Sequence, residues 1–282
     1  MGLISPHPPV TELPPTDAAA EEEFFALARS ARLNLGSRWI RGYVDWEWSH
    51  IRHLFRCGLA APEGRDVLEF GCNLGATSIV LALLGARVTA VDPNPDFLTL
   101  ARANAARYGV ASRITFSRIQ GSAPLPWPEE VFDLICMNSV LEYIPHRGLE
   151  PILLELGRTL RPGGTVLICS TSNRWSPVEP HSGAWWVSFL PRALEERVSG
   201  RRHDAARAVS PREAKRPFYG YEDLVWRDKG EALFRAKQAM GVGRGRLLAL
   251  RCLSALARPF GISAGMLTPY FTLALQKPAR AA

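Results

Sequence analysis

The stretch that decides the fold is Val67-Leu68-Glu69-Phe70-Gly71-Cys72-Asn73-Leu74-Gly75. It reads as a buried strand, an acidic residue near the end of that strand, and a glycine turn that opens a helix. A second acid, Asp92, closes the next strand-like run, Arg87-Val88-Thr89-Ala90-Val91. A doubly wound α/β domain that holds an adenosine-containing cofactor has the same order of strand, glycine turn, helix, strand and acid.

The spacing of the glycines separates two cofactor classes. A dinucleotide site needs G-x-G-x-x-G, but the chain has Asn73 and Ala76 where the second and third glycines would stand. The pattern present is E-x-G-x-N-x-G, which resembles the first motif of class I S-adenosylmethionine-dependent methyltransferases, E/D-x-G-x-G-x-G. Asn73 replaces the middle glycine, and Asn accepts left-handed backbone angles better than most residues. We therefore expect S-adenosylmethionine as cofactor rather than NAD.

Four further motifs resemble the same family and occur in the expected order. They would supply the ribose-binding acid, the loop against the adenine, the fourth strand and the turn before the fifth strand. Ser122 stands where the family usually has Asp in the adenine loop. The four segments are Asp92-Pro93-Asn94-Pro95, Gly121-Ser122-Ala123-Pro124-Leu125-Pro126, Phe132 to Pro145, and Leu160-Arg161-Pro162-Gly163-Gly164.

The resemblance implies a set of cofactor-binding residues. Glu69 and Gly71 would lie beside the methionine part, and the backbone of residues 72–75 would surround its tail. Asp92 would hold the ribose, although an acid at this position can instead cap a helix. Asn138 ends the fourth strand and would contact cofactor or acceptor, or else satisfy its own backbone. The implied set is Glu69, Gly71, Cys72, Asn73, Gly75, Asp92, Pro93, Ser122, Ala123 and Asn138.

The expected architecture is α/β: a doubly wound, Rossmann-like, seven-stranded sheet with an antiparallel last strand, an N-terminal helical cap and an insert before the last strand. We expect a disordered N-terminus over residues 1–20 and a helical cap over 21–60. The cofactor-binding core would follow over 61–172, with a substrate-recognition insert and the end of the sheet over 173–282. Predicted strands cover 114–119, 165–170 and the region from Met266 onward.

The insert carries the candidate catalytic residues. It leaves the fifth strand at its carboxyl end, so we expect residues 173–191 to line the acceptor pocket. His181 is the candidate general base and Glu179 its partner, because a histidine with a pKa near neutrality suits removal of a hydroxyl proton. A merely solvated loop histidine is the alternative. Trp185, Trp186 and Phe189 would cover an apolar acceptor or serve ordinary packing.

Composition limits the setting in which the protein works. The chain has 282 residues, 47% of them hydrophobic, and a net charge of +7. Its five cysteines are scattered and never occur as C-x-x-C, so we expect reduced thiols in a cytoplasmic protein, and neither a metal site nor a disulfide framework. The proline-rich start does not resemble a secretory signal, and no apolar run reaches the ~18 residues of a membrane span.

A leucine- and arginine-rich segment over residues 246–258 leaves three uses open. It can lie on a membrane surface as a peripheral contact, form a dimer interface, or belong to the core, which is the most frequent use. The oligomeric state is not predicted.

The leading functional interpretation is methyl transfer to a small molecule, such as oxygen methylation of a sugar, lipid-linked or quinone-like acceptor. A nucleic-acid methyltransferase is the second hypothesis. The fourth strand ends Asn138-Ser139-Val140-Leu141 rather than in the N/D-P-P-Y/F run used on bases, so no nucleic-acid partner is expected. A non-catalytic scaffold that binds the cofactor is the third.

Overall fold

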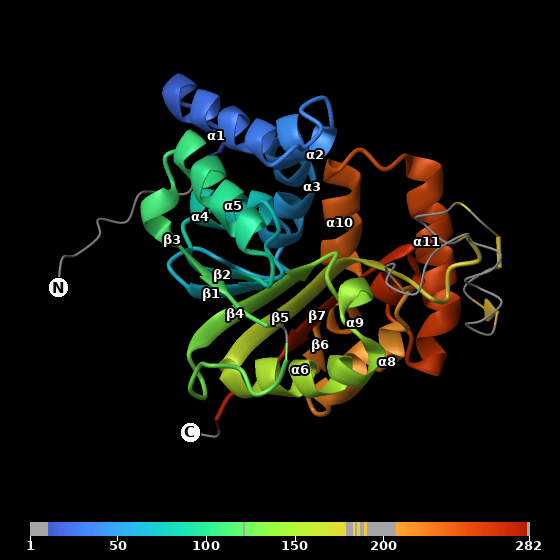
Figure 1. Cartoon of the computed structure of the whole chain (residues 1–282). Coiled ribbons are helices and arrows are strands. Elements are labelled where there is room, and N and C mark those ends of the chain that lie inside the picture. Colours follow the sequence, from blue (N-terminus) through green and yellow to red (C-terminus); the bar gives the residue numbers. More distant parts are fainter. Residues whose placement is uncertain are drawn as a thin grey trace. The chain divides into compact units, whose positions relative to one another are not determined.

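The structure of the protein is a computed structural model (Figure 1), which describes residues 11–120, 122–178, 183, 185–186, 189–190 and 207–280. The chain divides into two compact units. The first unit is Met1–Gly121 with Phe132–Ile135, and the second is Ser122–Val131 with Cys136–Ala282. The N-terminal helical segment therefore belongs to the same unit as the first three strands.

Seven strands are connected in the order β3-β2-β1-β4-β5-β7-β6, and the last strand is antiparallel to its neighbours. This order confirms the predicted α/β fold with an antiparallel last strand. The strands are β1 Asp66–Phe70, β2 Arg87–Asp92, β3 Ile114–Arg118, β4 Phe132–Asn138, β5 Leu160–Ser172, β6 Glu222–Asp223 and β7 Tyr270–Gln276.

The first unit is built on three parallel strands. β1 pairs with β2 from Asp66 opposite Arg87 to Phe70 opposite Val91, and β2 pairs with β3. This register brings the carboxyl ends of β1 and β2 to one edge, where parallel α/β sheets bind ligands. The helices of this unit are α1 Ala18–Ser30, α2 Arg38–Arg41, α3 Tyr43–Arg56, α4 Ala76–Leu83 and α5 Pro95–Arg107, with a 3-10 turn, η1, at Ala111–Arg113.

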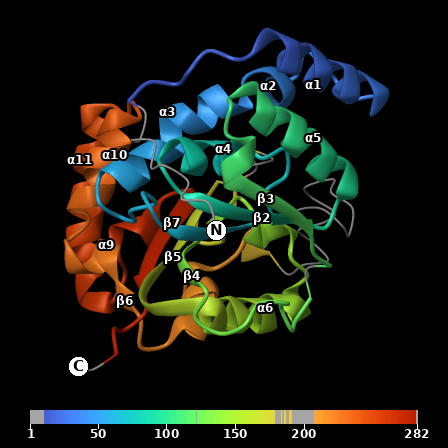
Figure 2. The ribbon, with the colours of Figure 1, turned by 90° about the vertical axis from the view of Figure 1, so that its left-hand side faces the viewer.

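The N-terminal helices pack on the glycine turn. Phe24 and Ala28 of α1 and Ile40 of α2 form one buried cluster with Leu74 and with Leu100 of α5. Both views show α1 beside α5 (Figure 2). Helices α1 and α2 therefore pack against Leu74, which lies in the turn between β1 and α4.

The predicted end of disorder at residue 20 is too late, because α1 already begins at Ala18. Asp17 caps this helix and accepts a hydrogen bond from the Ala20 N–H at 2.9 Å. A cap of this kind satisfies an otherwise unpaired N–H group in the first turn.

Helix α5 begins and ends as its sequence predicts. Asn94 is its N-cap and accepts from the Asp96 N–H at 2.9 Å, with Pro95 in the first turn. Gly109 follows the helix with a φ of +67°. Asn before Pro at the start and Gly beyond the end are the residues that these positions favour.

The second unit holds the end of the sheet. β7 pairs antiparallel with β5 and with the two-residue β6. β5 is longer than the predicted 165–170 because the Pro-Gly-Gly segment already belongs to it, and β7 begins four residues after Met266 because a 3-10 turn precedes it. Its other elements are α6 His146–Thr159, α8 Pro211–Lys215, α9 Leu224–Arg227, α10 Glu231–Ala239 and α11 Arg244–Ala257, with 3-10 turns η2 Leu141–Tyr143, η4 Arg216–Phe218, η5 Arg258–Phe260 and η6 Ala264–Leu267.

Of the three uses left open for the 246–258 segment, the structure does not support the core. α11 buries only Leu247 and Ser254, whereas Leu248, Leu253 and Leu256 are exposed. The helix packs against α10 and the η6 turn through one narrow face, so its remaining leucines have no place in the core.

Candidate functional site

The turn between β1 and α4 is closed by backbone hydrogen bonds. The N–H groups of Gly71 and Cys72 both donate to the Val91 carbonyl, at 2.8 and 2.9 Å. Gly71 has a φ of +82° and Asn73 a φ of +47°. Asn73 thus adopts the left-handed conformation that its place in the glycine pattern predicts, and the loss of the middle glycine leaves the turn intact.

Gly75 is required by both conformation and packing. Its φ is +76°, a region that side-chain-bearing residues rarely adopt. A Cβ at this position would lie 3.1 Å from the Ala101 Cβ and 3.3 Å from a ring carbon of Phe116. The last glycine therefore lets α4 start close to α5 and β3.

Asp92 ties the two strand ends together. It is buried, with 7% of its surface exposed, and its two carboxylate oxygens accept from the N–H groups of Asn73 and Asn94, each at 2.9 Å. The alternative interpretation of Asp92 as the cap of α5 is wrong, because Asn94 caps that helix. Each oxygen has a second lone pair, so the carboxylate retains capacity to accept from further hydroxyl groups.

Glu69 is a buried acid behind the turn. The Ser78 hydroxyl donates to its carboxyl group. Burial raises the pKa of Glu69 to about 8. The negative charge of Glu47 raises this pKa further, whereas hydrogen bonds from Ser78 and Thr77 lower it. Without a ligand, the Glu69 carboxyl group is therefore largely protonated at neutral pH. A cation beside this group would favour its ionised form.

Glu47 of α3 is the residue that sequence motifs did not identify. Only 5% of its surface is exposed, and its charge acts on Glu69. α3 packs against α4, which places an acid from the N-terminal segment near the acid of β1. A polar residue on the apolar face of α3, between Val44 and Ile51, is the signal that would have found it.

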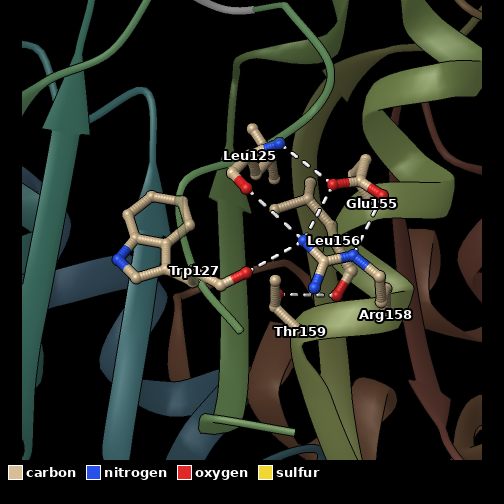
Figure 3. Close-up of polar contacts among 6 residues, drawn as sticks. All are labelled: Leu125, Trp127, Glu155, Leu156, Arg158 and Thr159. Atoms are coloured by element: carbon tan, nitrogen blue, oxygen red, sulfur yellow. Dashed lines mark hydrogen bonds and ion pairs between the residues drawn. The ribbon is translucent and has the colours of Figure 1, made fainter. Parts of the chain in front are cut away.

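The loop that resembles the adenine motif is fastened to α6 (Figure 3). The Glu155 carboxylate accepts from the Leu125 N–H at 2.9 Å, and the Arg158 guanidinium donates to the Trp127 carbonyl at 2.9 Å. Glu155 and Arg158 also pair with each other at 2.8 Å. Ser122 and Ala123, the predicted contacts to adenine, are exposed ahead of this fastened part.

The end of β4 is polar and buried. Asn138 is 8% exposed, and its side-chain oxygen lies 3.5 Å from the Cys169 sulfur of β5. Next along the chain, Ser139 has a φ of +54° and its hydroxyl donates to Glu142 at 2.9 Å. Asn138 thus contacts the neighbouring strand.

Asn173, at the start of the predicted acceptor segment, is a structural residue. Its amide donates to the carbonyls of Met266 and Thr268, both at 2.8 Å, and its oxygen accepts from the Trp175 N–H. With 1% of its surface exposed, it fastens the segment after β5 to the turn before β7. All of its polar atoms are used in this role.

The aromatic residues of the acceptor segment are exposed. Trp185, Trp186 and Phe189 have 68%, 60% and 54% of their surfaces in solvent, so ordinary core packing does not explain them. The candidate base His181 and its partner Glu179 lie outside the described residues.

One other histidine lies near the end of β4 and is already engaged. His146 begins α6, and its Nδ1 lies 2.9 Å from both the Glu213 carboxylate and the Arg207 guanidinium. This arrangement fixes the ring of His146 between two charged neighbours.

All five cysteines lie in the described part of the chain and none is joined to another by a disulfide; Cys72, Cys136 and Cys169 are buried. Among the described residues, no group of three or more His, Cys, Asp and Glu side chains is arranged to hold a metal ion. Within the same part of the chain, no helix combines the length and hydropathy needed to cross a membrane.

Comparison with known proteins identifies the domain. Residues 67–164 match the family described as "Methyltransferase domain". Demethylmenaquinone methyltransferase of Tropheryma whipplei is 31% identical over 48% of this chain and 53% of that protein. Ubiquinone biosynthesis O-methyltransferase of Methylocella silvestris is 32% identical over 55% of this chain and 56% of that protein. The chain spans about half the length of these curated relatives.

A solved structure supports the same fold. The S-adenosylmethionine-dependent methyltransferase from Mesorhizobium loti aligns with a TM-score of 0.51 and 16% identity, covering 81% of this chain and 98% of that chain. The strand order and this alignment define a Rossmann-like α/β fold. Residues 67–164 thus form a methyltransferase domain, similar to the domains of class I methyltransferases that use S-adenosylmethionine as methyl donor.

Proposed function

We propose that this protein transfers the sulfonium methyl group of S-adenosylmethionine to a small, apolar, quinone-like acceptor. The observation that carries the proposal is the turn of residues 71–75, closed on the buried carboxylate of Asp92 at the carboxyl edge of β1 and β2. Such an edge is where open α/β sheets hold adenosine cofactors.

The residues of the first unit suit the two ends of the cofactor. The remaining lone pairs of the Asp92 carboxylate accept hydrogen bonds from the ribose hydroxyl groups, and Pro93 flanks the ribose. The N–H groups of Cys72, Asn73 and Gly75 already bond within the protein. We therefore assign the methionine carboxylate to the first turn of α4, which has no side-chain cap and a favourable helix dipole.

Glu69 suits the cationic part of the cofactor. The ammonium and sulfonium groups are positively charged, and a buried acid beside them loses its proton when they arrive. Methyl transfer removes the sulfonium charge, which weakens this attraction in the product. Following the family resemblance, we assign the adenine contacts to Ser122 and Ala123, and a contact with the acceptor to Asn138.

The reaction needs little beyond positioning. In an in-line displacement the acceptor oxygen forms a bond to the methyl carbon while the carbon–sulfur bond breaks and its electron pair returns to sulfur. Alignment of the two reactants alone can supply ~7–11 kcal/mol of the barrier. The acceptor hydroxyl must lose a proton, and we assign that proton to His181 as general base, with Glu179 as its partner.

The acceptor class rests on two supports. The relatives named above are called demethylmenaquinone methyltransferase and ubiquinone biosynthesis O-methyltransferase. The exposed rings of Trp185, Trp186 and Phe189 offer an apolar surface to a flat ring after β5.

A methyl-transfer assay tests the proposal. The purified protein is supplied with tritiated S-adenosylmethionine and, in separate reactions, a quinone that carries a free ring hydroxyl, transfer RNA and a catechol. Label in the quinone, and none in the RNA, supports the proposal. Label in RNA alone contradicts the acceptor class, and calorimetric binding of NAD with no response to S-adenosylmethionine contradicts the cofactor.

A further inference from the structure

The face of α11 that points away from the protein is apolar. Leu248, Cys252 and Leu256 are spaced four residues apart, so they line one side of the helix, and Phe260 follows at the same spacing beyond its end. Leu248, Leu256 and Phe260 have 63%, 72% and 73% of their surfaces in solvent. Surface helices usually place such residues inward. We call this row the α11 stripe.

Arginines border the α11 stripe on both sides. At 100° per residue, Arg244 and Arg251 fall on one border and Arg246 on the other. Arg244 and Arg246 are exposed, and Arg251 pairs with Glu231 of α10 at 2.9 Å. Long basic side chains at the edge of an apolar face can keep their charges in the polar layer while the face is buried.

After Glu231, every charged side chain of the sequence is basic. From Ala232 to Ala282 there is no Asp or Glu. The same stretch contains eight basic residues, namely Arg235, Lys237, Arg244, Arg246, Arg251, Arg258, Lys277 and Arg280. The net charge of the chain is +7, so this stretch accounts for its basic character. A partner that meets the α11 stripe also meets the charges of Arg244 and Arg246, whereas Arg251 is already paired with Glu231.

We propose that the α11 stripe docks on the surface of an anionic lipid bilayer. A helix with an apolar face bordered by Arg lies in the plane of such a surface, with the leucines at the boundary of the acyl chains. Each cation held near an anionic leaflet strengthens the attachment about fivefold. This inference does not depend on the methyl-transfer proposal.

A second copy of the chain fits the α11 stripe less well. The 14-residue helix is ~21 Å long, and a strip ~10 Å wide on it offers ~200 Å². A stable dimer needs about 800 Å² from each partner. Symmetric pairing of the stripes would also bring like-charged arginines together, which disfavours association.

Sedimentation with vesicles tests the proposal. The full chain is mixed with vesicles of phosphatidylcholine alone and of phosphatidylcholine with phosphatidylglycerol. We expect binding to the anionic vesicles that weakens as salt rises. The double variant Leu248→Ser with Leu256→Ser should bind at least tenfold more weakly. Arg244→Gln with Arg246→Gln should weaken binding to anionic vesicles by more than tenfold.

Leu154→Ser is the matched control, because Leu154 is an exposed leucine on α6, 52% in solvent. It should bind vesicles as the parent protein does, and an unchanged thermal melting curve shows that each variant is folded. Equal vesicle binding by the parent and the double leucine variant overturns the proposal. So does a concentration-dependent dimer, without vesicle binding, that the double variant abolishes, since the occupant is then a second copy.

Discussion

The cofactor edge and the acceptor segment differ in how much of each is built before any ligand arrives. At the cofactor edge, Asp92 accepts from the N–H groups of Asn73 and Asn94, and the turn is closed on Val91. In the acceptor segment, Trp185 and Trp186 present most of their surface to solvent.

This difference predicts different sources of binding energy for the cofactor and for the methyl acceptor. At the proposed cofactor site, S-adenosylmethionine would meet hydrogen-bonding groups that are already in place, which lowers the ordering cost of binding. At the proposed acceptor site, the acceptor would meet exposed aromatic rings, and burial of these rings would favour binding. Substitutions at the edge should therefore change cofactor affinity, and substitutions in the segment should change turnover or acceptor affinity.

The largest expected effect separates the two regions most sharply. His181→Ala should lower kcat by ~10²–10⁴-fold, the usual contribution of a general base, while cofactor affinity stays near that of the parent. Single-turnover methyl transfer and calorimetry measure the two quantities. His146→Ala is the matched control, because that histidine is engaged with Glu213 and Arg207. Full turnover by the His181 variant would show that His181 has no catalytic role. Loss of cofactor binding would show that residues 173–191 contact the cofactor instead of the acceptor.

Asp92→Ala tests the cofactor edge. It removes the hydrogen bonds accepted by a charged group, so S-adenosylmethionine affinity should fall by about 1.5–3 kcal/mol, more than tenfold. Asp96→Ala is the control, since Asp96 is an exposed acid in the first turn of α5. Calorimetry on both variants, with melting curves, gives the comparison. A folded Asp92 variant with parental affinity shows that the carboxylate only supports the turn.

The pH dependence of binding tests Glu69. Its pKa, raised to about 8 from 4.5, means that the folded ligand-free protein holds a proton that the unfolded chain has lost between these values. Stability attributable to Glu69 therefore falls as pH rises through this window. A cationic cofactor favours the ionised form, so its affinity should rise about tenfold per pH unit up to about pH 8 and then level off.

Calorimetry in buffers of different ionisation enthalpy measures the proton released on binding. Glu69→Gln cannot ionise and should bind with no pH slope in this range. A slope that survives in Glu69→Gln belongs to another group and disconnects Glu69 from the cofactor. Glu47 is then the next candidate, because its charge acts on Glu69. The variant Glu47→Gln measures how much of the pH slope comes from Glu47.

The smallest expected effect lies in the adenine loop. Arg158→Gln removes the donors to the Trp127 and Leu125 carbonyls, so the loop should hold its shape less well. We expect only a two- to fivefold loss of S-adenosylmethionine affinity, because the Arg158 side chain is partly exposed and solvent screens its pairing with Glu155. Arg161→Gln, at the start of β5, is the comparison variant. Equal effects of the two substitutions dissociate the loop from adenine binding.

The sequence predicted well those parts of the fold whose local rules agree. The buried run of β1, the Asn94 cap of α5 and the left-handed Asn73 follow from strand pattern, capping and turn chemistry. β6 was not predicted, because two residues carry no hydrophobic alternation. The position of the α11 leucines was left open between core and surface, because periodicity does not show which side of a helix contacts the protein.

The residues of the candidate site were predictable where a local motif marks them, and not where tertiary packing brings them in. Glu69 and Asp92 stand at strand ends that a motif marks, whereas Glu47 comes from a helix with no motif and reaches Glu69 only through tertiary packing. Asn173 was predicted to line the acceptor pocket, but its amide bonds to carbonyls some 93 and 95 positions away. Contacts at that sequence separation leave no local signature.

The bonds that Asp92 makes to the backbone have a consequence for the speed and heat of cofactor binding. Fixing a backbone residue costs about 1–2 kcal/mol of conformational entropy, and residues 71–75 are already fixed. Association then needs no loop-folding step, so its rate constant should vary little between ligands that share the adenosine part. The heat capacity change on binding should reflect the ligand and site surfaces that are buried, without a contribution from loop folding.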